Sequence, residues 1–245
     1  MNEIILILAA LLLGLASGFI GGVATGGGLV SIPSLMFMGL PPAAAIATNN
    51  LNTVSGITSA LRFHKSQKLQ IRKMWPLLFT SFFGSLAGSK LLLHLNQTVI
   101  QKTFAIVSIV LVITFVLNKG PHSAKRGKIH SLLGIFAVFL GSIFAGLFGT
   151  GGGFFVVYIL CYFYGLNIME ANANTKVINI AGTISVIAVF LHAGLINFQV
   201  GIPMMVGSTI GGYVGAHTAL KNGEDLVKTI FLLAVFVSGI KLLLE

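Results

Sequence analysis

The stretch Ile4-Ile-Leu-Ile-Leu-Ala-Ala-Leu-Leu-Leu-Gly-Leu-Ala-Ser-Gly-Phe-Ile-Gly-Gly-Val-Ala24 opens a run, residues 4–61, that contains no Asp, Glu, Lys or Arg. Uncharged runs recur at residues 129–169 and 177–220. A membrane-spanning helix needs about 20 apolar residues, so each run is long enough for more than one segment at membrane depth. The sequence therefore predicts an all-α, multi-pass integral membrane protein.

The composition supports this class and excludes an ordinary soluble fold. Of the 245 residues, 56% are hydrophobic and only 8% are charged, whereas soluble domains average about 25% charged residues. The net charge of +10 would suggest nucleic acid in a soluble protein. Here nine of the fifteen basic residues fall in two loops, residues 62–73 and 119–128. The positive-inside rule places both loops in the cytoplasm, and we expect no nucleic-acid partner.

The apolar segments form two similar sets. Thr25-Gly-Gly-Gly28 recurs as Thr150-Gly-Gly-Gly153, and Thr48-Asn-Asn-Leu-Asn52 recurs as Thr175-Lys-Val-Ile-Asn179. We infer two repeats, residues 1–118 and 130–245, joined by a basic cytoplasmic connection at residues 119–129; transporters are often built this way. The predicted segments are 4–23, 28–40, 43–62, 74–93 and 99–118, then 130–148, 153–165, 172–193, 200–220 and 226–244.

The segments 28–40 and 153–165 are too short to cross about 30 Å of hydrocarbon as straight helices. Each follows a triple glycine, so we expect broken or re-entrant helices, a common mark of transporter binding sites. If they do not cross, the chain has eight spans in two parallel repeats with both termini inside; if they cross, it has ten spans and inverted repeats. The absence of Lys and Arg from residues 192–200 favours inversion, but the shortness of the two segments leads us to predict eight spans.

The two glycine clusters are the first candidates for a substrate site. Free backbone N–H groups and the positive end of a helix dipole attract anions, and a threonine precedes each cluster. Close helix packing around a flexible break is the alternative explanation. The candidate residues are Thr25, Gly26, Gly27 and Gly28 in the first half and Thr150, Gly151, Gly152 and Gly153 in the second.

The polar residues of the third segment in each half are the second candidates. Asn49, Asn52 and Thr53 would share one helical face, and the second half offers Asn174, Thr175 and Asn179. An amide buried without a partner is costly, so these side chains should bind substrate, line water or form hydrogen bonds between helices.

Lys176 is the strongest single candidate. Placing an ammonium group on a spanning helix costs free energy, so such a residue is a functional candidate by default. It could neutralise an anion or take part in proton coupling. Snorkelling to the membrane surface or pairing with Glu170 are the alternatives. We find no nucleophile–base arrangement and too few acids for a metal site, so we predict no enzyme activity, metal or cofactor.

The residues in these blocks resemble the TauE/SafE family of membrane proteins, the sulfite exporter or anion permease family. The resemblance rests on 18–33 and 47–51 in the first half, and on 145–153, 174–176 and 211–216 in the second. Tyr158 stands where the first half has Pro33. The resemblance implies transport of sulfite, sulfonates or related sulfur-containing anions across the bacterial inner membrane.

Together these features predict a secondary transporter of a small anion, with alternating access around a midplane site between the two repeats. We expect coupling to a proton or to the membrane potential, and a homodimer fits so small a carrier. An anion channel, or a membrane scaffold or assembly protein without transport, are the alternatives.

Overall fold

The computed structural model describes residues 3–66, 71–100 and 128–223, together with the single positions 69, 102, 103, 106, 226 and 229. All regular elements in this part of the chain are helical, as the sequence predicts. The predicted segments 99–118 and 226–244 lie largely outside the described residues. The elements are α1 (Glu3–Ala24), α2 (Gly27–Phe37), α3 (Pro42–Asn49), the 3-10 helix η1 (Asn50–Thr53), α4 (Val54–His64), α5 (Ile71–His94), α7 (Lys128–Phe148), the 3-10 helix η2 (Gly149–Gly152), α8 (Gly153–Tyr164), α9 (Ile168–His192) and α10 (Phe198–Asn222).

Among the described residues, three helical stretches are long and apolar enough to cross a membrane, namely Glu3–Ala24, Met74–His94 and Ile168–His192. Large apolar side chains point outward from the bundle, among them Leu12 of α1, Phe79 of α5, Phe136 of α7 and Ile210 of α10, each more than half exposed. Such a surface suits lipid, which has no penalty for contact with apolar side chains.

Two parallel helix pairs dominate the packing. Gly14, Gly18 and Gly22 of α1 face Met204, Ser208 and Gly212 of α10 in the same order, so the two helices run in the same direction. A Cβ atom at any of the three glycines would overlap the backbone of α10. Small residues at such contacts let membrane helices approach closely. Helices α1 and α10 therefore form one tight seam.

The second seam joins α5 to α7. Gly84 and Gly88 of α5 face the backbone of Phe139 and Ile143 of α7, again in the same order along both helices. Each seam thus pairs a helix from the first half of the chain with one from the second half. The two halves interlock rather than fold side by side.

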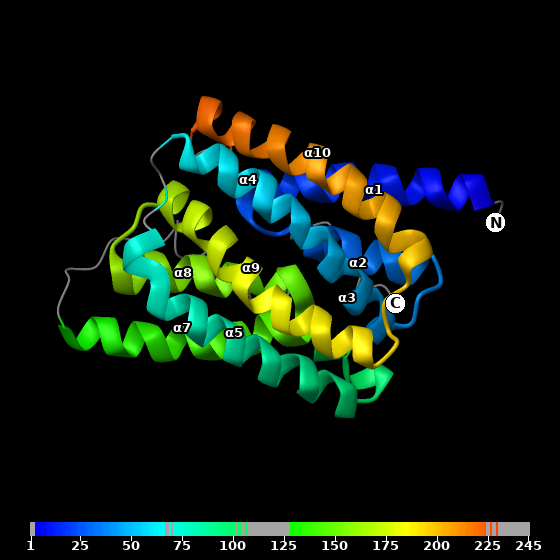
Figure 1. Ribbon diagram of the computed structural model, residues 1–245, viewed down its shortest axis with the longest axis horizontal. Helices are drawn as coiled ribbons and strands as arrows, with labels where there is room; N and C mark the ends of the chain where they lie inside the picture. The colour runs from blue at the N-terminus through cyan, green and yellow to red at the C-terminus, as the bar shows by residue number, and fades with distance from the viewer. Residues whose placement is uncertain are drawn as a thin grey trace.

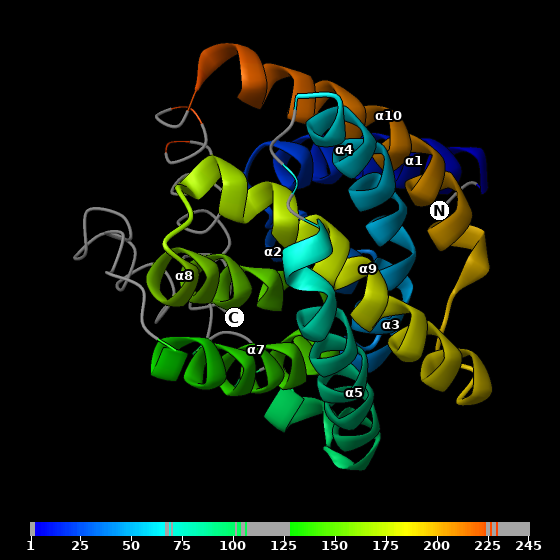
Figure 2. The same ribbon diagram turned by 60° about the vertical axis from the view of Figure 1, so that its left-hand side comes forward.

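The helices form two groups of opposite direction (Figures 1 and 2). Helices α1, α4 and α10 run one way, and α5, α7 and α9 run the other way. Within the first group Thr58 Oγ1 of α4 donates to the carbonyl oxygen of Thr209 at 3.1 Å. Within the second group Ser185 Oγ of α9 donates to the carbonyl oxygen of Phe82 at 2.9 Å. The substrate-site candidates lie between these two groups.

The short helices α2 and α8 turn back along the helix that precedes each of them. Thr25, with a φ of 49°, makes the turn after α1, and Gly149, with a φ of 65°, makes the turn after α7. Gly27 then packs against the backbone of Ser17, and Gly134 near the start of α7 lies against Tyr164 at the end of α8. The predicted short segments are therefore confirmed as short helices of 11 and 12 residues.

The third predicted segment, 43–62, is not one continuous helix. Asn50 Nδ2 donates to the carbonyl oxygen of Ile46 at 2.8 Å, and the next turn is the 3-10 helix η1. In a 3-10 helix, positions three residues apart lie nearly one above the other, so this turn does not by itself separate Asn49 from Asn52. The two side chains nevertheless contact different helices: Asn49 Oδ1 accepts from Ser31 of α2, whereas Asn52 Nδ2 donates to Ser17 of α1.

Candidate substrate-binding site

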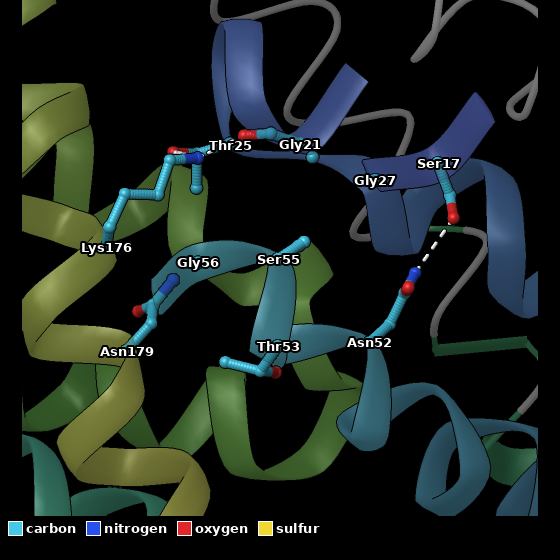
Figure 3. A pocket seen from close by; sticks show the side chains of 11 residues that line it. Ser17, Gly21, Thr25, Gly27, Asn52, Thr53, Ser55, Gly56, Lys176 and Asn179 are labelled. Carbon is cyan, nitrogen blue, oxygen red and sulfur yellow. Dashed lines mark hydrogen bonds between the residues drawn. The ribbon is translucent and has the colours of Figure 1, made fainter. Parts of the chain in front are cut away.

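A buried cavity lies between the two helix groups, where the turn after α1, the break at η1 and helix α9 meet (Figure 3). The volume open to water-sized atoms is about 30 Å³. One water molecule needs about 10–15 Å³ by this measure, so the cavity holds about two. Its lining residues are Ser17, Gly21, Thr25, Gly26, Gly27, Asn52, Thr53, Ser55, Gly56, Lys176 and Asn179.

Among the described residues that line the cavity, Lys176 alone has a basic side chain. Its side chain is 5% exposed, and its Nζ donates to the carbonyl oxygen of Gly21 and, at 2.7 Å, to Thr25 Oγ1. Figure 3 shows the aliphatic stem extending from α9 toward the turn after α1. Both partners are uncharged oxygen atoms, a backbone carbonyl and a hydroxyl, so neither supplies a negative charge to this side chain.

The two alternative explanations of Lys176 are wrong. A snorkelling side chain would extend to the membrane surface, but Lys176 is buried. Glu170 forms a capping box instead of an ion pair: its backbone N–H donates to Asn167 Oδ1 at 2.8 Å, and its carboxylate accepts from the Asn167 N–H at 3.2 Å. This pairing satisfies the first turn of α9.

A chain of hydrogen bonds fixes the turn after α1 against α9. Thr25 Oγ1 donates to Asn172 Oδ1, and Asn172 Nδ2 donates to the carbonyl oxygen of Val23 at 2.8 Å. A positive φ at a β-branched residue is strained, and such strain persists only where the surroundings impose it. The bonds from Asn172 and Lys176 supply that constraint, so Thr25 is held in place from two directions.

Asn52 lies on the opposite wall and has an unsatisfied oxygen. Its side chain is 4% exposed, and its Nδ2 donates to Ser17 Oγ at 2.8 Å while Ser17 Oγ donates to the carbonyl oxygen of Gly14 at 3.2 Å. Asn52 Oδ1 has no hydrogen-bond partner. A buried polar atom left unpaired costs about 1–3 kcal/mol, which indicates that water or a ligand fills this position.

Only part of the second glycine cluster can be compared with the first. Gly152 and Gly153 are buried, and a Cβ at Gly153 would meet Asn179 Nδ2 and, at 2.8 Å, Thr25 Cγ2. Gly153 thus packs directly behind the cavity wall without lining it. Thr150 and Gly151 belong to η2 by their backbone, and the surroundings of these two residues lie outside the described structure.

The structure brings seven of the candidate residues to one cavity: Thr25, Gly26, Gly27, Asn52, Thr53, Lys176 and Asn179. Gly28, Asn49, Asn174 and Thr175 are buried nearby but do not line it. Asn174 Nδ2 instead donates to the carbonyl oxygen of Glu170 at 2.8 Å.

Sequence reasoning missed Ser17 and Gly21, although a signal was present. Ser17, Gly21 and Thr25 are spaced four residues apart, and that spacing places residues on one face of a helix. The polar Ser17 and Thr25 on either side of a small residue mark the face of α1 that lines the cavity.

The geometry favours a negatively charged ligand. The first turn of α2, with Gly26 at the N-cap and Gly27 at the first position, adjoins the cavity, and the free N–H groups of a helix N-terminus favour anions. Lys176 adds a donor group that is positively charged when it is protonated. Among the described residues no cluster of three or more His, Cys, Asp or Glu side chains could hold a metal ion.

Comparison with known proteins indicates a family of membrane proteins. The model of the sulfite exporter TauE/SafE family matches residues 10–242. The chain belongs to this family. A relative from Haemophilus influenzae, named "Probable membrane transporter protein", is 32% identical over 95% of this chain and 92% of its own length.

Two further relatives carry similar names. The Escherichia coli K12 protein YfcA is 28% identical over 94% of this chain and 86% of its own length, and the Bacillus subtilis protein YunE is 23% identical over 100% and 98%. Both are named as membrane transporters, not as enzymes. No solved structure matches the chain. The family, the relatives and the apolar helices together identify a multi-pass bacterial membrane protein of a transporter family.

Proposed function

We propose that this protein is a secondary transporter that carries a small sulfur-containing anion, sulfite or an organic sulfonate, through the cavity beside Lys176. The observation that carries the proposal is the buried Nζ of Lys176 at this cavity. Lys176 lies eight residues after Ile168, the first residue of α9, which is about 12 Å along the helix. An ammonium at that depth is costly unless it serves a ligand or an ion path.

The size of the cavity fits sulfite or the SO₃⁻ group of a sulfonate. Space for about two water molecules corresponds to roughly 60 Å³ of liquid volume, which is comparable to a four-atom oxyanion. Lys176 would neutralise one negative charge, and the first N–H groups of α2 would bind oxygen atoms. Sulfur chemistry itself comes from the family's description as sulfite exporters.

We infer further that the two halves are inverted repeats. The first helices of the halves, α1 and α7, run in opposite directions, and so do the pairs α4 and α9 and α5 and α10 (Figure 1). The bond from Thr58 to Thr209 has its counterpart in the bond from Ser185 to Phe82, with 127 residues between Thr58 and Ser185 and between Phe82 and Thr209. These directions support the inverted alternative over the parallel repeats that we predicted from segment length.

The charges at the two ends of the bundle support one orientation. Arg62 lies in the last turn of α4 and Lys65 directly follows that helix, Lys221 lies in the last turn of α10, and Lys128 begins α7; these positions gather at one end of the bundle. By the positive-inside rule this end faces the cytoplasm. Residues 193–197, between α9 and α10, would then face outward.

Alternating access would move the two helix groups against each other around the cavity, because the lining comes from α1, α2 and α4 on one side and α9 on the other. The moving bodies would therefore be mixed sets of helices and not the two halves of the sequence. Transport would be driven by the membrane potential or by a coupled ion, and a proton is the candidate that the sequence suggests. A homodimer stays a prediction.

The test is flux of radiolabelled sulfite in proteoliposomes, with Lys176→Met as the probe and Lys221→Met as the matched control. We expect saturable transport by wild type and by Lys221→Met, and at least a hundredfold loss for Lys176→Met. Equal rates in all three proteins would remove Lys176 from the mechanism. Current that rises linearly with sulfite concentration would identify a channel instead.

A further inference from the structure

A second, smaller cavity lies on the far side of Asn179 from the cavity described above. It is lined by Ser85 of α5, Ala145 of α7, Gly149 of η2, and Asn179, Thr183 and Val186 of α9. The volume open to water-sized atoms is about 10 Å³, which is room for one water molecule or one small ion. Asn179 is the residue that lines both cavities.

The hydroxyl groups around this second cavity use their hydrogen atoms elsewhere. Ser85 Oγ donates to the carbonyl oxygen of Ser142 at 3.2 Å, and Thr183 Oγ1 donates to Thr53 Oγ1 at 3.4 Å. Their lone pairs are therefore left to face other partners. Asn179 Oδ1 is buried and has no hydrogen-bond partner, and neither has the adjacent Ser142 Oγ. The cavity thus offers acceptors, which suit a cation and not an anion.

The end of a helix adds negative potential at the same place. Helix α7 ends at Phe148, and Gly149 then turns the chain with a φ of 65°. The last carbonyl groups of a helix lack internal partners and carry partial negative charge. In secondary transporters such helix ends and unwound carbonyls coordinate Na⁺. Ala145 and Gly149, which flank this end, both line the cavity.

The lack of charge in the lining selects among cations. None of the six lining residues is acidic or basic. Ca²⁺ is usually held by several carboxylates, and Mg²⁺ by one or two together with water, so a neutral set of oxygen atoms fits a monovalent ion. Neutral oxygen ligands leave no cluster of His, Cys or acidic residues in the sequence, and for that reason the sequence predicts no metal site here.

We propose that this second cavity binds Na⁺, and that this ion is the coupling ion of the anion carrier. The coupling part rests on the proposed function. Asn179 separates the two ligands, and Thr183 lies seven residues beyond Lys176 on α9, about 10 Å along the helix. Na⁺ is therefore kept away from the ammonium group and close to the anion. Each ligand raises the affinity of the other by the same factor, because such coupling is reciprocal.

Two residues of the anion cavity have counterparts at or beside the second cavity: Asn179 lines it, and Ser142 accepts a hydrogen bond from the lining residue Ser85. Ser17 and Asn52 form a pair at the anion cavity, and Ser142 and Asn179 occupy the corresponding positions of the second half, 125 and 127 residues later. What differs is the charge: the corresponding position to Lys176 in the first half is Asn49. The two cavities, which share corresponding residues of the two halves, would thus bind ions of opposite charge.

Binding of ²²Na⁺ to purified protein in choline chloride, with no sulfite present, tests the cation site alone. The probe is Thr183→Val, which replaces the hydroxyl by a methyl group of similar size, and the control is Thr80→Val, a threonine of α5 that bonds Pro76 in its own helix. We expect saturable binding by wild type and the control, and at least a tenfold weaker affinity for Thr183→Val. Ser85→Ala provides a second probe in case Thr183→Val does not fold. Absence of saturable binding by folded wild type would overturn the proposal.

Sulfite flux in proteoliposomes, with pH and membrane potential clamped, tests the coupling. We expect an inward Na⁺ gradient to accelerate uptake by wild type at least tenfold over choline, and Ser85→Ala or Thr183→Val to lose this acceleration. Equal uptake in Na⁺ and choline would overturn the coupling and leave the anion carrier intact. Saturable ²²Na⁺ binding without sulfite flux under any gradient would overturn the proposed substrate and the coupling while the cation site stands.

Discussion

Lys176 Nζ donates to Thr25 Oγ1 at 2.7 Å, across 151 residues of sequence. Thr25 also donates to Asn172 Oδ1, so its hydroxyl both accepts from the cation and anchors the turn between α1 and α2. An anion that attracts the ammonium group competes with this bond. Ligand binding would therefore loosen the contact between the turn and α9.

The first prediction concerns that hydroxyl. Thr25→Val keeps the shape but leaves the Asn172 oxygen without its donor, and a buried group left unpaired costs about 1–3 kcal/mol. We expect its melting temperature in detergent to fall by several degrees, while Thr25→Ser stays near wild type. If both variants melt together, the hydroxyl does not stabilise the turn.

The second prediction concerns the charge at the cavity wall opposite Lys176. Asn52→Asp preserves shape and adds a negative charge, so we expect sulfite affinity to fall at least a hundredfold, because like charges in a poorly solvated site repel strongly. Asn197→Asp is the matched control: Asn197 caps α10, and Asp caps equally well. Sulfite-dependent thermal shifts measure both. Undiminished binding by Asn52→Asp would move the anion away from this wall.

The third prediction separates packing from binding. Gly18→Ala forces a methyl group against the backbone of Ser208, and overpacking of this kind costs about 1–3 kcal/mol. A Cβ at Gly56 meets nothing closer than 3.8 Å, so Gly56→Ala should fold as well as wild type. Because Gly56 lines the anion cavity, we expect this variant to bind sulfite more weakly. Thermal unfolding and binding assays should therefore rank the two variants in opposite order.

The fourth prediction concerns Glu170, whose carboxylate accepts from the N–H of Asn167. Gln can replace Glu in a capping box, so Glu170→Gln should transport sulfite at the wild-type rate. Glu170→Ala should lose about 1 kcal/mol of stability, as loss of a cap does. A transport defect in Glu170→Gln as large as that of Lys176→Met would show instead that the carboxylate carries charge or protons.

The fifth prediction concerns orientation. In a Cys161→Ala background, Lys65→Cys and Ala193→Cys each introduce one thiol at opposite ends of the bundle, beyond α4 and beyond α9. An impermeant maleimide should label Ala193→Cys in intact cells and Lys65→Cys only after permeabilisation. The reverse pattern would contradict the orientation inferred from the basic end.

The sequence was informative where the distribution of charge and the length of apolar segments decide the position of a helix. The uncharged runs predicted helical segments close to the observed α1, α5, α7, α9 and α10, because exclusion of charge from hydrocarbon leaves few alternatives. The triple glycines predicted the two short helices. Lys176 stood out because an ammonium at membrane depth is costly.

The sequence was uninformative where the geometry of a single turn, or the meeting of distant helices in space, decides the structure. The 3-10 helix η1 interrupts the third predicted segment between α3 and α4, and nothing in the periodicity distinguishes this stretch from a continuous α-helix. Segment length favoured parallel repeats, whereas the observed helix directions favour inverted ones, because a short helix can reverse the chain without crossing as a straight span. The second cavity is made of neutral oxygens from three distant helices, and only their meeting in space reveals it.

The glycine seam between α1 and α10 has a consequence for biosynthesis. Helix α1 leaves the ribosome before α10, and the residues of α10 that contact its glycines follow 190 residues later. Until then Gly14, Gly18 and Gly22 have lipid or another segment beside them instead of α10. The nascent chain must hold α1 in the bilayer without this partner, and a truncated product that ends before α10 would leave the glycine face of α1 open to wrong partners.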